Sequence, residues 1–234
     1  MRKVFLAIAI VGLVFSWSGT ASAVVLFSSG TPDYYGGWYS DPTNSSWQAY
    51  DDFTLSSAAT ITGIEWWGFY FPGNTPPATD AFMYDIQSNP GGGGGPSGDI
   101  TSGSLGDGSP IDTGSYATTT SGTLEFYEYS AAVNIALPAG AYFLSIDDTA
   151  SNPGNVFCWA TTPESPTDIW DIYSGSTWES QLAYYGDTGY GLEGAAFNLT
   201  GESSGATVPE PATMTLLGLG LAGLATKVAR RKNR

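Results

Sequence analysis

Carboxylates are the only side chains in the central part of the chain that suit acid–base chemistry. The 234-residue chain contains 22 Asp and Glu, 7 Lys and Arg, one Cys and no His, with a net charge of -15. Every Lys and Arg lies either at residues 2–3 or after residue 226. Ser-His-Asp triads, Cys-His pairs and Schiff-base lysines are therefore excluded between these ends. The usual His/Cys zinc sites are excluded as well.

A glycosidase needs only two carboxyl groups, placed about 5–10 Å apart. Sugar-binding basic and amide groups are scarce in this region, so we expect no enzyme activity and assign no catalytic residue. The alternative is a carboxylate-dependent carbohydrate-active enzyme. Its candidate residues are Asp51 and Asp52, Glu65, Asp80 and Asp85, Glu125 and Glu128, and Asp147 and Asp148.

Asp147 and Asp148 are also weak calcium candidates. Carboxylate oxygens suit Ca²⁺, and Ser151 and Asn152 follow closely. The sequence has no Asp-x-Asp-x-Asp-Gly loop, however, and a solvated acidic turn explains the pattern better. We therefore expect no cofactor. Cys158, the single cysteine, lies between aromatic residues in VFCWA, which indicates a buried, inert thiol.

Aromatic side chains offer a second kind of chemistry, because their rings can stack on sugar rings. Trp38, Trp66 and Trp67 are the candidates for glycan stacking. Trp66 and Trp67 are adjacent, so they point to opposite faces of a strand and one can lie outside the core. Packing in a core remains the plainer interpretation for most of the aromatic residues in these clusters, which are Tyr34, Tyr35, Trp38, Tyr39, Trp66, Trp67, Trp170, Trp178, Tyr184 and Tyr185.

The elements that must position these residues read as β-strands. Runs rich in aromatic and β-branched residues alternate with Gly, Pro, Asn and Ser clusters, and no long 3.6-residue period occurs between the two ends. We expect strands at 24–27, 49–55, 60–71, 81–87, 124–130, 133–137, 141–147, 156–161, 169–173 and 194–200. This pattern predicts an all-β fold, an antiparallel, jelly-roll-like β-sandwich spanning residues 24–200.

Two segments of this region read as unpacked. Residues 89–110 contain GGGGGPSG and predict a flexible Gly-rich loop. Residues 201–208, which include GESSGAT, predict a linker.

The N-terminus has the organisation of a secretory signal peptide. Arg2 and Lys3 precede an apolar stretch, expected to be helical, and Ala21-Ser22-Ala23 forms a small-residue cleavage box. We expect a signal peptide at 1–23, removed by signal peptidase between Ala23 and Val24. An uncleaved anchor is the alternative, but the apolar stretch is short for a membrane span.

The C-terminus combines a proline–acid–proline box, an apolar segment and a basic cluster. Val208, Pro209, Glu210 and Pro211 precede residues 212–229, which we expect to form a transmembrane helix. The basic tail, residues 227–234, contains Lys227, Arg230, Arg231, Lys232 and Arg234 and marks the cytoplasmic side. Positive charge at both ends of the chain places the body between them outside the cytoplasm.

These three parts, in this order over residues 209–234 and with Val208 before them, resemble the PEP-CTERM sorting signal of Gram-negative bacteria. The resemblance implies processing by an exosortase-like membrane enzyme and an association with exopolysaccharide-producing, biofilm-forming bacteria. DDF at 51–53, EWWGFY at 65–70 and LPAGAYFLSI at 137–146 are loosely similar to domains found ahead of such tails.

The combined interpretation is an exported protein held briefly in the inner membrane and then delivered to the cell surface or extracellular matrix. We expect a structural, adhesive or glycan-binding role there, with exopolysaccharide as a candidate partner. A permanently anchored surface protein is the alternative. Nucleic acid is excluded as a partner, because the body has no cations to neutralise phosphates.

Overall fold

The computed structural model describes residues 23–45, 47–73, 76, 79–91, 95–119, 122–150, 154–163, 170–174, 177–179 and 194–204. The predicted signal helix and Ala21 lie outside these residues, as do the sorting box, the membrane segment and the basic tail. Among the described residues, no helix is long and apolar enough to cross a membrane.

Every regular element in the described part of the chain is a β-strand. In chain order these are β1 (Val24–Ser28), β2 (Gly37–Tyr39), β3 (Trp47–Leu55), β4 (Ala59–Phe71), β5 (Phe82–Ser88), β6 (Ser97–Gly106), β7 (Ile111–Thr119), β8 (Gly122–Leu137), β9 (Gly140–Asp148), β10 (Val156–Thr162), β11 (Trp170–Ser174), β12 (Thr177–Glu179), β13 (Gly194–Ala195) and β14 (Phe197–Ser203).

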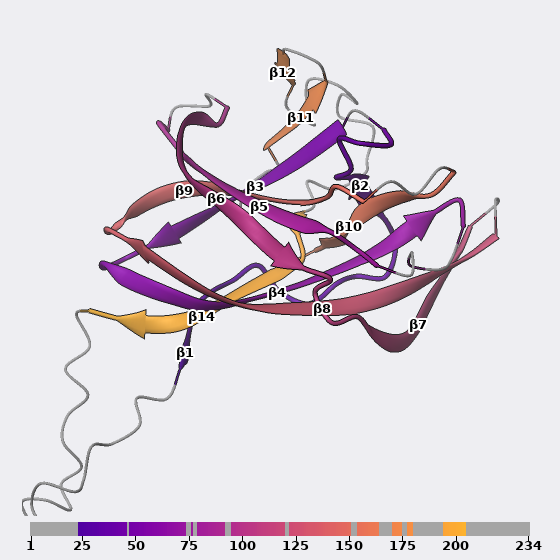
Figure 1. The fold of residues 1–234 in the computed structure, drawn as a ribbon, viewed down its shortest axis with the longest axis horizontal. Helices are drawn as coiled ribbons and strands as arrows, with labels where there is room; N and C mark the ends of the chain where they lie inside the picture. Colours follow the sequence, from indigo (N-terminus) through magenta and orange to yellow (C-terminus); the bar gives the residue numbers. More distant parts are fainter. Residues whose placement is uncertain are drawn as a thin grey trace, which may run out of the picture. The chain divides into compact units, whose positions relative to one another are not determined.

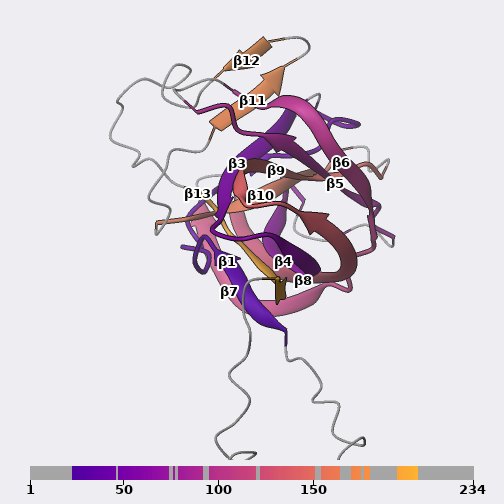
Figure 2. The ribbon, with the colours of Figure 1, turned by 90° about the vertical axis from the view of Figure 1, so that its left-hand side faces the viewer.

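The strands form two antiparallel sheets, as Figures 1 and 2 show. The smaller sheet has the order β12-β11-β3-β9-β5-β6. In the larger sheet, the long strand β4 pairs with β14 and β8 along residues 59–66, so these two strands flank it on opposite sides. Further along, β4 pairs with β10. The predicted all-β, antiparallel, sandwich-like fold is confirmed, and the jelly-roll connectivity stays a prediction.

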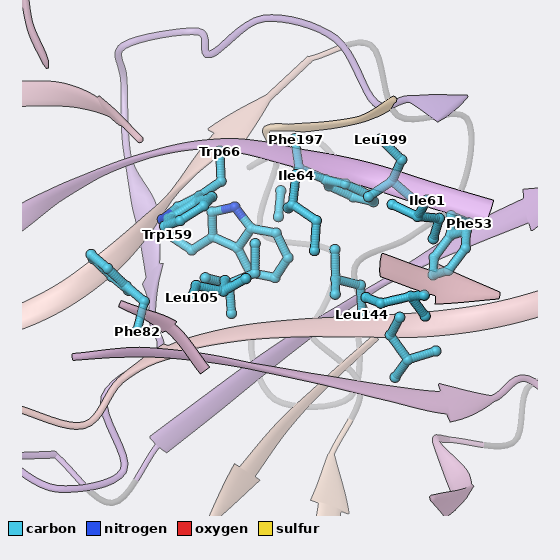
Figure 3. Close-up of a cluster of buried hydrophobic side chains, with 14 of the residues drawn as sticks. Phe53, Ile61, Ile64, Trp66, Phe82, Leu105, Leu144, Trp159, Phe197 and Leu199 are labelled. Carbon is cyan, nitrogen blue, oxygen red and sulfur yellow. The ribbon is translucent and has the colours of Figure 1, made fainter. Parts of the chain in front are cut away.

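The main core lies between the two sheets and is rich in aromatic rings (Figure 3). Trp66 stacks on Tyr129 with ring centroids 5.5 Å apart, and Phe53 stacks on Tyr142 at 5.3 Å. Aromatic side chains bury large apolar areas, which is the main stabilising contribution in a body whose sequence contains no basic residue for a salt bridge.

A second apolar cluster covers the other face of the larger sheet. Trp67 and Phe69 of β4 and Cys158 of β10 lie in this cluster, together with Phe126 of β8. Phe126 packs 4.9 Å from Phe69 and edge-on to Tyr34 at 5.4 Å, measured between ring centroids. The larger sheet is therefore apolar on both faces. The predicted buried position of Cys158 is confirmed, with 2% of its surface exposed.

Two predicted boundaries are wrong. The segment 89–110 is not one long loop, because β6 occupies residues 97–106 and pairs with β5. Likewise, residues 201–203 are not linker: β14 continues to Ser203, and Gly201 pairs with Ile61. Both stretches are rich in Gly and Ser, whose weak strand propensity is overridden by pairing with a neighbouring strand.

Candidate functional site

Within the part of the chain that the structure describes, five buried aspartates are the chemically distinctive feature. They are Asp41, Asp51, Asp80, Asp147 and Asp148, each with 7% or less of its surface exposed. Residues 4–226 contain no Lys, Arg or His, so none of these carboxyl groups has a basic side chain from this region to pair with. A buried carboxylate without a cation is costly, and such groups instead collect hydrogen bonds or retain a proton.

Asp147 lies on β9, on the face opposite the main core. Its Oδ1 accepts hydrogen bonds from Ser40 Oγ (2.8 Å) and Ser145 Oγ (3.0 Å), and its Oδ2 accepts one from Gln48 Nε2. Burial raises the pKa of Asp147 to about 7, because the three hydrogen bonds compensate only part of the lost hydration.

A second polar group lies beside Asp147 on the same sheet. The Tyr50 hydroxyl donates to Asp85 Oδ2 (2.6 Å), and Gln87 Nε2 donates to the same oxygen (2.7 Å). Burial raises the pKa of Tyr50, and the neighbouring Asp85 carboxylate raises it further, so this phenol stays protonated.

Asp80 and Asp148 meet at the hydroxyl group of Tyr70. The Tyr70 oxygen lies 2.6 Å from Asp80 Oδ1 and 3.0 Å from Asp148 Oδ2. The other oxygen of Asp148 accepts hydrogen bonds from the backbone N–H groups of Ala81 (3.1 Å) and Ala150 (2.9 Å). Burial, with the nearby charges of Asp148 and Asp107, raises the pKa of Asp80 to about 7 against an opposing hydrogen bond from Tyr70.

The remaining two buried aspartates hold backbone in place. Asp41 Oδ1 accepts from the Asn44 N–H (2.8 Å) and its Oδ2 from the Phe157 N–H (3.2 Å). Asp51 accepts from the N–H groups of Asp52 and Ala195, both at 2.9 Å. Burial raises the pKa of both carboxyl groups.

Two of the carboxylate pairs suggested by sequence order do not form as pairs. Asp147 and Asp148 point to opposite faces of β9 and bind different partners, so they do not converge on one calcium ion. Among the described residues, no group of three or more His, Cys, Asp or Glu side chains is placed to hold a metal ion. Asp80 and Asp85 likewise belong to separate networks, around Tyr70 and Tyr50.

Two pairs that sequence order did not suggest are brought together instead. Asp80 and Asp148 share the Tyr70 hydroxyl. Glu65 of β4 lies beside Glu128 of β8, where burial and the Glu65 charge raise the pKa of Glu128. Both pairs bridge strands or turns far apart in sequence, and no local motif could have indicated them.

The prediction that three tryptophans can stack on glycans is wrong for two of them. Trp66 is fully buried in the main core and Trp67 is 6% exposed in the second cluster, because both faces of β4 are covered. Trp38 is half-buried and packs against the main core. Tyr35 and Tyr39, on either side of Trp38 in the sequence, are 68% and 41% exposed and are the accessible aromatic residues of this segment.

Comparison with known proteins identifies the C-terminal end of the chain. Residues 207–232 match the family model described as the PEP-CTERM protein-sorting motif. No curated protein matches the chain. The chain therefore carries, at residues 207–232, the sorting tail of exosortase substrates, which marks it as an exported protein held at a membrane before processing.

Proposed function

We propose that this protein is a structural or adhesive component of the cell surface or extracellular matrix, with exopolysaccharide as its partner. The match of residues 207–232 to the PEP-CTERM motif is the observation that carries the proposal. In this proposal, signal peptidase cuts after Ala23, an exosortase-like enzyme then removes the tail, and the folded β-body is released as the mature protein.

The pairing of the first and last strands supports this route. Val24 of β1 pairs with Gly201 of β14, so the start and the end of the folded body lie side by side. The signal peptide and the C-terminal segment therefore continue from neighbouring positions of one sheet, and attachment of both to one membrane needs no rearrangement of that sheet.

The composition and surface of the body support the proposed matrix role. Residues 24–208 contain 21 of the 22 acids and no basic residue, which favours solubility and excludes phosphate-rich partners. Tyr35 and Tyr39 offer exposed rings for contact with sugars. Binding through exposed rings requires no catalytic group, so we favour a binding role over the carbohydrate-active enzyme.

The direct test is intact mass spectrometry of the protein from its native cells, with the membrane and the medium analysed separately. We expect a mass that begins at Val24 and ends near residues 209–211, found mainly outside the membrane. The variant Glu210→Gln tests whether the acid of the box is recognised, and we expect it to accumulate in the membrane with its tail intact.

Glu202→Gln is the matched control, since it removes the same charge from an exposed position of β14, eight residues before Glu210. It should be processed like the natural protein. A natural protein that runs through to Arg234 in the membrane fraction would contradict the proposal and favour a permanent anchor.

A further inference from the structure

The contacts around Tyr70 raise a question of proton count. A phenol hydroxyl carries one proton and can donate one strong hydrogen bond. Its oxygen nevertheless lies within hydrogen-bond distance of two carboxyl groups, at 2.6 Å from Asp80 and 3.0 Å from Asp148. The two contacts are both hydrogen bonds only if one of the aspartates carries a proton and donates it to the Tyr70 oxygen.

The partners of Asp148 show which aspartate holds that proton. Two backbone N–H groups, from Ala81 and Ala150, already donate to Asp148 Oδ1. Its Oδ2 faces the Tyr70 hydroxyl. Asp148 is therefore surrounded by donors and is the charged acceptor, whereas Tyr70 is the single hydrogen-bond partner of Asp80 within the described part of the chain.

We propose that the folded body binds one proton on Asp80, in a relay in which Asp80 donates to Tyr70 and Tyr70 donates to Asp148. This proton binding makes the fold more stable in mildly acidic than in alkaline solution. The proposal is independent of the sorting route, since it concerns only the folded body.

The burial of Asp80 and the neighbouring acidic charges favour its protonated form, against the opposing hydrogen bond with Tyr70. Tyr70 of β4 contacts Asp80, which precedes β5, and Asp148, which ends β9. Tyr129 of β8 and Asp107, which follows β6, lie within electrostatic range of Asp80. Asp41 lies within range of Asp148. These are two neutral phenols and carboxyl groups, and residues 4–226 contain no base that could stabilise a charge on Asp80.

The direction of the pH effect follows from the proton count. The pKa of Asp80 is about 7 in the folded state and 3.8 as an isolated side chain. Between these values the folded state binds a proton that the unfolded state has lost. The stabilisation is complete below about pH 4 and is lost as the pH rises through 7, and this one proton contributes about a tenfold fall in the folding equilibrium constant per pH unit in this window.

Denaturant unfolding of the natural protein, Asp80→Asn and Asp148→Asn at pH 5, 6, 7 and 8 tests the proposal. The amide introduced by Asp80→Asn can donate to Tyr70 as the protonated acid does. We expect the ratio of this variant's folding equilibrium constant to that of the natural protein to be about 100-fold greater at pH 8 than at pH 5. Between pH 5 and 7 the folding equilibrium constant of Asp80→Asn should fall less steeply than that of the natural protein. The difference between the two slopes should be about one tenfold step per pH unit. Asp148→Asn should be less stable than the natural protein at every pH, because its amide meets N–H and O–H donors.

Glu202→Gln, which removes an exposed charge, should leave the pH dependence unchanged. Equal pH slopes in the natural protein and Asp80→Asn would overturn the proposal. Greater stability of Asp148→Asn than of Asp80→Asn at pH 8 would also overturn it, by placing the proton on the other carboxyl group. The proposal would also be overturned if millimolar Ca²⁺ at pH 8 stabilised the natural protein but not Asp80→Asn, since the site would then hold a metal ion rather than a proton.

Discussion

At the scale of single residues, the body deals with buried acids through hydrogen bonds and protons alone. Asp51 illustrates the first solution, because both of its oxygens accept backbone N–H groups and so join β3 to β13. Asp80 illustrates the second solution in our proposal, in which the carboxyl group keeps a proton and donates it to Tyr70, which in turn donates to Asp148. In an ordinary protein a lysine or arginine would serve, but this body has neither.

The exposed tyrosines allow the proposed binding to exopolysaccharide to be tested. Tyr35→Ala removes a ring that is 68% exposed and should weaken binding to exopolysaccharide isolated from the native cells. A single aromatic contact is worth about 0.5–1.5 kcal/mol, so the expected loss in affinity is about 2- to 10-fold. Affinity electrophoresis or calorimetry measures it.

Tyr116→Ala is the control for this measurement, because Tyr116 is 52% exposed but lies on β7. It should bind like the natural protein. Equal losses for both variants would point to general surface effects, and no loss for Tyr35→Ala would remove this ring from the proposed site.

At the scale of elements, β4 is the strand that organises the body. Its 13 residues pair with β8, β14 and β10 and supply side chains to both apolar clusters. Alternation along β4 sends Trp66 to one cluster and Trp67 to the other. The same arrangement explains why β14 must extend to Ser203, since its final residues pair with the first residues of β4.

Gly201→Ala tests the extended boundary of β14. A Cβ at position 201 would collide with the Thr60 carbonyl oxygen and lie 2.8 Å from a methyl carbon of Leu26. We expect a loss of about 1–3 kcal/mol in the free energy of unfolding, because backbone atoms cannot move aside easily. Denaturant unfolding gives this value directly.

The comparison variant is Gly140→Ala, whose Cβ would meet only the end of the Tyr142 side chain at 3.2 Å. It should change stability by less than about 0.5 kcal/mol. If Gly201→Ala were equally harmless, residues 201–203 would behave as the linker that the sequence suggested.

At the scale of the whole molecule, the charge distribution separates a wholly acidic body from two basic ends. The body has no basic residue whose ion pairs could be lost at high salt, and its like charges repel one another. Added salt screens this repulsion, with a Debye length of about 10 Å at 0.1 M.

We therefore expect the melting temperature at pH 7 to rise when NaCl is increased from about 10 to about 500 mM. A rise of at least about 2 °C corresponds to roughly 1 kcal/mol in a body of this size. Tetramethylammonium chloride should act similarly, because screening depends on ionic strength rather than on the cation. A melting temperature that is unchanged or lower in salt would contradict the role assigned to self-repulsion.

The sorting signal and the class of fold can both be predicted from the sequence alone. The sorting box, apolar segment and basic tail are contiguous, and strand periodicity is a local property, so each can be read without knowing what packs against it. The family match at residues 207–232 and the two antiparallel sheets confirm these predictions. Absence of basic residues is likewise visible in the sequence and excludes whole classes of chemistry.

Which side chains meet could be learned only from the folded structure. Asp80 and Asp148 are far apart in the sequence, and they share Tyr70 because the end of β9 passes close to β4. The burial of both Trp66 and Trp67 depends on the second apolar cluster, which includes residues from β4, β8 and β10. Burial and proton sharing depend on contacts between distant strands, and neither composition nor spacing along the chain records those contacts.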